Sequence, residues 1–245
     1  MKSTWIKAGA VLTACLLGTV VSAADFSTWA KRMQITFDGY PSGRGTLTNF
    51  PALVRLQDGS NGVDFADFES GGADLRFTDV TFTNELNYEI ESWDDADSNS
   101  WIWVQVPELE NGTRIYAYWG QAGETAPSYT TDGSTWDDDF VGVWHLNGAA
   151  GSVVDATDNG NDGTAQNGPE RGASGIVAGA VDFELQTSNF EHIEIPTSAT
   201  TQNLQEDDYT IEAWFRPSSV PAGSGSDWNA NYGLLIKKGY HTGTR

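Results

Sequence analysis

Glu89 and Glu91 have the residue type and spacing closest to a catalytic pair in this chain. Residues i and i+2 of a β-strand share a face and lie about 6.5–7 Å apart, near the separation of paired glycosidase carboxylates. Tyr88 and Ile90 alternate with the two glutamates and are expected to fill the buried face. The pattern therefore favours two glutamates on a solvated face of an antiparallel strand over a catalytic pair.

Residues 155–163 are the best candidate for a metal site. Asp155, Thr157 and Asn159 place oxygen donors at alternate positions, as in tight loops that wrap calcium. The acidic residue that should close such a loop is missing, because Gln166 stands at the twelfth position. Two alternatives stay open: a weak calcium site formed by these three residues, or an Asx-type turn between strands. Calcium is the only cofactor that the sequence suggests.

Two tryptophans are candidate ligand-binding residues. Trp101 and Trp103 lie on one face of an expected strand, with Ile102 and Val104 on the other. Aromatic side chains exposed on a sheet can stack on sugar rings, whereas strand aromatics more often belong to a core. Both interpretations stay open for this pair.

The sequence lacks the other common catalytic signatures. His145, His192 and His241 are isolated, because none has a second His, Cys or acidic residue at a spacing suited to zinc. The chain also lacks a serine nucleophile elbow, a phosphate loop, a dinucleotide fingerprint and a zincin motif. We therefore assign no catalytic residues and expect the protein not to be an enzyme.

The N-terminus has the pattern of an export signal. Two lysines precede an apolar run over residues 8–21, and small residues follow it. The run is too short for a comfortable transmembrane span. Cleavage after Ala23 would remove residues 1–23 as a signal peptide and leave a chain without membrane insertion. Lipidation at Cys15 is the alternative. Either way we expect a secreted, extracellular or periplasmic protein associated with the cell surface.

Charge and composition restrict the partners and the source of stability. The net charge of −21 argues against nucleic acid or an anionic membrane as a partner, because like charges repel. The single cysteine lies in the leader, so the mature chain cannot form an internal disulfide. It must fold around hydrophobic cores, for which 10 Trp, 8 Tyr and 11 Phe supply apolar area.

Short strands separated by turn residues account for most of the chain after the leader. Apolar and polar residues alternate with period two, which is typical of half-buried strands. The expected strands lie at residues 33–37, 50–56, 75–77, 86–90, 101–106, 115–119, 141–146, 180–183, 192–195, 209–216 and 233–237. No stretch after the leader shows an apolar stripe of helical length. The sequence predicts an all-β protein.

The first half contains six ordered sequence blocks, at residues 32–36, 49–54, 73–79, 86–91, 103–107 and 116–120. Together they resemble the bacterial secreted family catalogued as domain of unknown function 2341 (DUF2341). The resemblance implies a β-sandwich domain over residues 29–122. Some members of that family are fused to components of envelope proton channels.

The second half contains four blocks, at residues 142–146, 155–164, 180–183 and 209–215. They resemble the start of a laminin-G/concanavalin A-like domain, many of which bind calcium. The turn-rich residues 123–139 are predicted to be a linker, and residues 140–245 a truncated jelly roll, since such a domain usually needs about 150–200 residues. We expect two β-sandwich or jelly-roll-type domains in tandem, the second incomplete.

These observations favour a non-catalytic extracellular binding or adhesion module that recognises a glycan or another surface ligand. One alternative is part of a secreted carbohydrate-active enzyme, a glycosidase with active strands beyond Arg245 or around Glu89 and Glu91. The other is a structural spacer in a large bacterial envelope protein, which includes envelope proteins associated with proton channels.

Overall fold

The computed structural model describes residues 25–95, 99–184, 191–198, 201 and 208–216. The chain divides into two compact units, residues 1–207 and residues 208–245. The described part of the second unit, residues 208–216, contains no strand, so the strand predicted at 209–216 is wrong there. A strand requires a ladder partner for its backbone groups, and this segment pairs with none of the described residues. The strand predicted at 233–237 lies outside the described residues.

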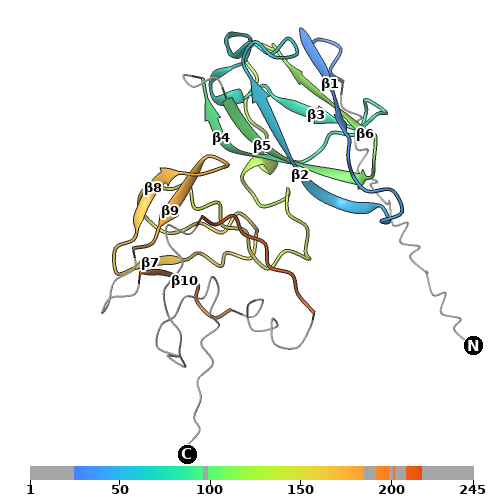
Figure 1. Cartoon of the computed structure of the whole chain (residues 1–245). Coiled ribbons are helices and arrows are strands. Elements are labelled where there is room, and N and C mark those ends of the chain that lie inside the picture. Colours follow the sequence, from blue (N-terminus) through green and yellow to red (C-terminus); the bar gives the residue numbers. More distant parts are fainter. Residues whose placement is uncertain (1–24, 96–98, 185–190, 199–200, 202–207, 217–245) are drawn as a thin grey trace, which may run out of the picture. The chain divides into compact units, whose positions relative to one another are not determined.

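Six antiparallel strands in the first half of the chain form a β-sandwich (Figure 1). One sheet has the order β1–β6–β3 and consists of β1 (Lys31–Phe37), β6 (Thr113–Trp119) and β3 (Arg76–Thr78). The other sheet has the order β2–β5–β4 and consists of β2 (Leu47–Gln57), β5 (Asn99–Leu109) and β4 (Tyr88–Asp94). The all-β prediction is confirmed.

The core of the sandwich follows from the period-two alternation of its strands. On β5, Ile102 and Val104 are fully buried, whereas Trp101 and Trp103 on the opposite face are only partly buried. Tyr88 of β4 and Trp119 of β6 are also buried in the core cluster. Burying a large apolar side chain stabilises the folded state by about 1.5–3 kcal/mol. Because the sequence has a single cysteine and cannot form an internal disulfide, buried rings such as Tyr88 and Trp119 are a main source of stability.

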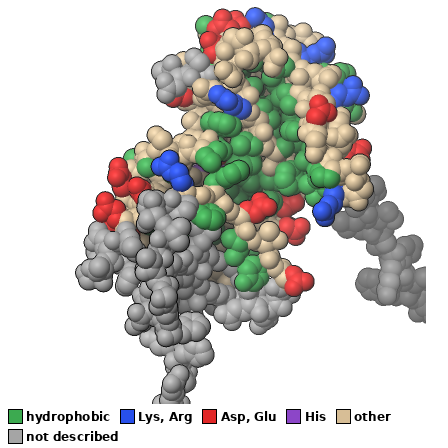
Figure 2. Space-filling model, viewed as in Figure 1, with side chains coloured by type: hydrophobic (Ala, Val, Ile, Leu, Met, Phe, Trp, Pro, Cys, Tyr) green, Lys and Arg blue, Asp and Glu red, His purple; other side chains and the backbone are tan. Residues whose placement is uncertain are grey.

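The helical turns of the described residues are short. They are the 3₁₀ segments η1 (Phe65–Asp67), η2 (Ser70–Gly72) and η3 (Ser128–Thr130). None of the helices among the described residues is long and apolar enough to span a membrane. In Figure 2, hydrophobic side chains gather over the strands of the sandwich, with Lys and Arg side chains around them.

The chain after the sandwich forms two small antiparallel sheets. In one of them β7 (Thr164–Gln166) pairs with β10 (His192–Glu194), and in the other β8 (Glu170–Ser174) pairs with β9 (Gly179–Asp182). The strands predicted at 180–183 and 192–195 are therefore confirmed within one residue. The strand predicted at 141–146 is wrong. The backbone N–H and C=O of Val143 bond to Asp155 and Ala156 instead of a neighbouring strand.

Candidate functional site

His145 lies between the carboxylates of Glu89 and Glu91 on the outer face of β4. Its Nε2 atom is 3.2 Å from Oε1 of Glu89, and its Nδ1 atom is 3.3 Å from Oε2 of Glu91. The exposed fractions of the side chains are 12% for His145, 20% for Glu89 and 3% for Glu91. We call these three residues the histidine clamp.

Two tryptophans complete the hydrogen bonds of the clamp. The indole N–H of Trp136 donates to Oε2 of Glu89 over 2.7 Å, and that of Trp103 donates to Oε2 of Glu91 over 2.6 Å. The centroid of the His145 ring lies 5.9 Å from that of Trp136 and 6.3 Å from that of Trp103. Each glutamate thus accepts hydrogen bonds from both an indole and the imidazole, which compensates for its loss of water.

The clamp determines the charge of its histidine. Burial disfavours the imidazolium and lowers its pKa, but the hydrogen bonds and charges of Glu89 and Glu91 outweigh that effect. They raise the pKa of His145 to about 9. At neutral pH the clamp therefore contains an imidazolium that donates to both glutamate side chains.

A β-bulge shapes β4 at the clamp. Ile90 pairs with Ile102 and Ser92 pairs with Trp101, so Glu91 is the extra residue on this strand. Bulges bend a strand locally and change the direction of a side chain, and they are frequent beside functional sites. Asn147, two residues after His145, donates from Nδ2 to the backbone carbonyl of Glu91 over 3.0 Å. The bulge therefore offers both a side chain and a carbonyl to the segment that carries His145.

The loop predicted to bind calcium holds the segment that leads to His145. Oδ1 of Asp155 accepts from the N–H of Val143 over 3.0 Å, and its Oδ2 accepts from the N–H of Asn161 over 2.9 Å. Oδ1 also accepts from the backbone N–H and the hydroxyl of Thr157. Asn159 donates from Nδ2 to the carbonyl of Phe140 over 2.8 Å. Both oxygens of Asp155 are thus acceptors for protein donors.

This arrangement favours the Asx-type turn of the two alternatives for residues 155–163. The Asp155 side chain bonds to the N–H of Thr157, two residues on, which is the hydrogen bond that defines such a turn. Over the part of the chain that the structure describes, no group of three or more His, Cys, Asp and Glu side chains is arranged to hold a metal ion. Calcium binding at Asp155, Thr157 and Asn159 stays a prediction.

The two tryptophans predicted to bind a ligand have different surroundings. Trp103 bonds to Glu91 and lies against Trp136, with ring centroids 5.5 Å apart. Trp101 instead lies beside the exposed Arg55, whose guanidinium carbon is 5.3 Å from the centroid of its ring. Arg55 in turn donates from Nε to Oδ1 of Asn99 over 2.9 Å. Of the pair, Trp101 is thus the residue whose surroundings suit an external ligand.

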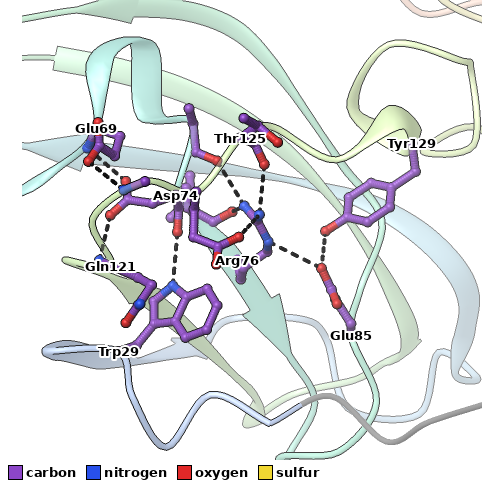
Figure 3. Close-up of polar contacts among 12 residues, drawn as sticks. Trp29, Glu69, Asp74, Arg76, Glu85, Gln121, Thr125 and Tyr129 are labelled. Atoms are coloured by element: carbon purple, nitrogen blue, oxygen red, sulfur yellow. Dashed lines mark hydrogen bonds and ion pairs between the residues drawn. The ribbon is translucent and has the colours of Figure 1, made fainter.

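A second polar network, around Arg76 and Asp74, supports the fold (Figure 3). The Arg76 side chain is buried and donates to the carbonyls of Ala73, Leu75 and Thr125. It also forms ion pairs with Glu85 and Glu124.

Asp74 ties the chain after β6 to the β3 edge of the sheet. Its buried carboxylate accepts from the backbone N–H groups of Glu69, Gly120 and Gln121. Because every bond of the two side chains is to the protein itself, we interpret this network as structural rather than as a ligand site.

Sequence reasoning missed the clamp for a simple reason. The sequence shows no acidic residue at a zinc-ligand spacing from His145, and its partner Glu89 lies 56 residues away in the sequence, so no local spacing reveals the contact. The prediction that Glu89 and Glu91 lie on a solvated face is wrong. Residues 136–147 cover that face, and Trp136 is itself buried. The sequence feature that could have indicated the site is the presence of two glutamates and two tryptophans on the outer faces of two adjacent strands.

Residues 123–139, which are predicted to be a linker, pack against the β2–β5–β4 sheet. Thr135 and Trp136 are buried, and the carbonyl of Thr135 accepts from the Gln105 side chain over 3.2 Å. Asn87 donates from Nδ2 to the carbonyl of Ser134 over 3.0 Å. Residues 123–139 also lie inside the first compact unit. The division of the chain into domains at 29–122 and 140–245 stays a prediction.

Comparison of the sequence with models of known protein families finds a match. No curated protein and no solved structure matches the chain. The matching family model covers β4, β5 and β6 together with the histidine clamp and both of its tryptophans. It therefore supports the resemblance found in the first half and extends past residue 122. Residues 71–147 match the family described as Domain of unknown function (DUF2341).

Proposed function

We propose that the chain is a non-catalytic extracellular module that binds a glycan, with Trp101 as its stacking platform. The observation that carries this proposal is the partly buried Trp101 ring beside Arg55 and Asn99. A sugar presents an apolar ring face for an indole and hydroxyl groups for planar polar side chains. Ligand sites typically combine an aromatic surface with a few fixed polar groups of this kind.

The surroundings of the glutamates support a non-catalytic role. A general acid or base must reach within hydrogen-bond distance of the substrate. The Glu91 side chain is 3% exposed, and its Oε2 atom already contacts both Trp103 and His145. Both oxygens of Glu89 are similarly engaged, by Trp136 and His145. The alternative of a carbohydrate-active enzyme is therefore the weaker candidate at this site.

Export and a tandem architecture belong to the same proposal. The leader supports secretion, and the blocks at residues 142–146 and 155–164 support a laminin-G-like second domain that begins after residue 139. The β7–β10 and β8–β9 sheets are in keeping with a β-rich second domain. The remaining alternative, a structural spacer in a large envelope protein, requires no ligand and is separated from the proposal by the experiment below.

A glycan array tests the proposal. We expect the protein to bind a neutral glycan, and Trp101→Ala to weaken that binding at least tenfold. Phe50→Ala is the matched control, because Phe50 is an exposed aromatic residue on the same sheet. Running the array with and without calcium also tests the metal prediction. A folded protein that binds no glycan, or equal loss in both variants, would overturn the proposal.

The enzymatic alternative requires its own measurement. We expect no turnover of a polysaccharide panel by the wild-type protein, Glu89→Gln or Glu91→Gln. Hydrolysis by the wild type that either substitution abolishes would identify the pair as catalytic and reject the non-catalytic proposal.

A further inference from the structure

A cluster of cationic and aromatic side chains lies on the outer face of the β1–β6–β3 sheet. In the β1–β6 ladder, Gln34 pairs with Tyr116 and Thr36 pairs with Arg114, and cross-strand partners share a face. Arg32 lies on the same face, two residues before Gln34. None of the residues that alternate onto this face of β1 or β6 is acidic. On the β3 side of the same face, Glu85 pairs with Thr78 and forms an ion pair with Arg76, so the basic cluster is confined to the β1–β6 part of the face.

Arg32 forms the centre of this cluster. Its guanidinium carbon lies 5.3 Å from the ring centroid of Phe82 and 5.6 Å from that of Tyr116, and the two rings are 4.6 Å apart. Over the described ranges, neither Arg32 nor Arg114 forms an ion pair with a carboxylate. Acidic residues outnumber basic ones by 34 to 13, so two exposed arginines without a carboxylate partner call for an explanation.

The turn between β3 and β4 presents Phe82 in a strained conformation. Phe82 has φ +65° and is 40% exposed. This left-handed backbone region is unfavourable for a bulky residue, and such strain persists where the surroundings enforce it, often at binding sites. Thr81 donates from its N–H and its hydroxyl to Oδ1 of Asp79, and the Phe82 N–H donates to the Asp79 carbonyl. The turn therefore holds an exposed ring in place against Tyr116.

We propose that this face binds an acidic oligosaccharide, with one of its carboxylates held by Arg32, another held by Arg114, and one of its rings against Phe82. Guanidinium groups match the geometry of a carboxylate and can donate two parallel hydrogen bonds to it. Charge complementarity selects an anion here, because neither arginine forms an ion pair with a carboxylate in the part of the chain that the structure describes. The strongly negative chain repels extended polyanions, so a short acidic oligosaccharide fits better than a long polymer. This site lies on the sheet opposite Trp101 and does not depend on the glycan proposed there.

Titration calorimetry with defined sugars tests the site. The probes are a tetramer of galacturonic acid and, as the uncharged control, a tetramer of galactose. We expect the acidic tetramer to bind at least tenfold more tightly and to lose affinity in high salt, which screens the arginine–carboxylate attraction. Arg32→Gln should weaken its binding at least tenfold. Arg44→Gln is the control, since Arg44 is also an exposed arginine but lies in the loop between β1 and β2, and it should leave binding of the acidic tetramer unchanged.

Phe82→Gly separates binding from folding. Glycine adopts positive φ without strain, so this variant should keep or raise the melting temperature while its affinity for the acidic tetramer falls. Unchanged affinity in Arg32→Gln or Phe82→Gly, or equal binding of the two tetramers, would overturn the proposal. Self-association that Arg32→Gln abolishes would also overturn it, because the face would then bind a second copy of the chain. If no neutral glycan binds at Trp101 but the acidic tetramer binds here as expected, the proposal for this face stands.

Discussion

The imidazole of His145 contacts Glu89, which lies 56 residues earlier in the chain, and its other nitrogen contacts Glu91. The contact joins the segment after the sandwich to the outer face of β4. It is a charged contact with little exposure, so its removal has a larger effect than that of a surface ion pair. We therefore expect this clamp to hold residues 136–147 on the outer face of the β2–β5–β4 sheet.

Replacing His145 with Gln should destabilise the protein by about 3 kcal/mol. The substitution removes the cation and leaves two partly buried carboxylates beside each other, and breaking such a buried pair typically costs about 3–5 kcal/mol. Urea unfolding followed by tryptophan fluorescence measures the change, since Trp103 and Trp136 both contact the clamp. Arg44→Gln, at an exposed position in the loop between β1 and β2, is the control and should change stability by less than about 0.5 kcal/mol. Equal effects of the two substitutions would contradict a clamp at His145.

The clamp also predicts how stability depends on pH. The pKa of His145 is about 9 in the folded protein and near the ordinary 6.5 when unfolded. A raised folded pKa means that the stabilisation is fully present below pH 6.5 and is lost as the pH rises through 9. The loss between pH 6 and 10 should be on the order of 3 kcal/mol. Unfolding free energies at a series of pH values measure it. In His145→Gln this component should vanish, and a variant that keeps the full alkaline loss would assign it to another group.

The alternation of residue types predicted most of the sandwich. On β5 the apolar residues Ile102 and Val104 face the core as expected, because a period of two has only one way to bury them. The same reasoning failed at residues 141–146, where apolar alternation is present but Asp155 and Ala156 take the backbone bonds of Val143. The alternation of apolar and polar residues predicts which side chains of a segment are buried, but not which groups form hydrogen bonds with its backbone.

The candidate site was less accessible to sequence reasoning. The alternation predicts that Glu91 faces outward and leaves Trp103 open between a ligand-binding and a core position. Trp136, from the predicted linker, and His145, from a predicted strand, cover this face instead. His145 is separated from both glutamates by two strands and their connections. Because a strand pattern contains no information about which distant loop packs on its outer face, solvated and covered faces are indistinguishable at the sequence level.

Asp155 tests the interpretation of residues 155–163. Asp155→Asn should lower the free energy of unfolding by about 2 kcal/mol in the presence of EDTA, since an amide cannot accept all the hydrogen bonds that the carboxylate accepts from Val143, Thr157 and Asn161. Thermal unfolding of both proteins in EDTA measures the effect. If calcium binds the loop, the wild type should also gain stability in proportion to the logarithm of calcium concentration. Equal stability of the two proteins in EDTA would contradict the structural role of the carboxylate.

Gly133 tests the contact between the segment before the clamp and the loop at 155–163. A Cβ atom at Gly133 would lie 2.6 Å from the backbone N of Asp158 and 2.9 Å from the backbone C of Thr157, and the residue has φ +89°. Backbone atoms cannot move aside as a flexible side chain can, so Gly133→Ala should destabilise by about 2–4 kcal/mol through the clash and the unfavourable φ together.

Gly151→Ala isolates the effect of the clash at Gly133. Gly151 has φ +78° but no atom within 4 Å of its Cβ position. Its substitution should therefore report backbone strain alone, about 1 kcal/mol. The difference between the two free energies of unfolding measures the contact of Gly133 with Thr157 and Asp158. A difference near zero would mean that the two segments separate in solution, and His145 would then be free to leave Glu89 and Glu91. A large difference, together with loss of the alkaline transition in Gly133→Ala but not in Gly151→Ala, would show that the loop, the segment and the clamp form one cooperative unit.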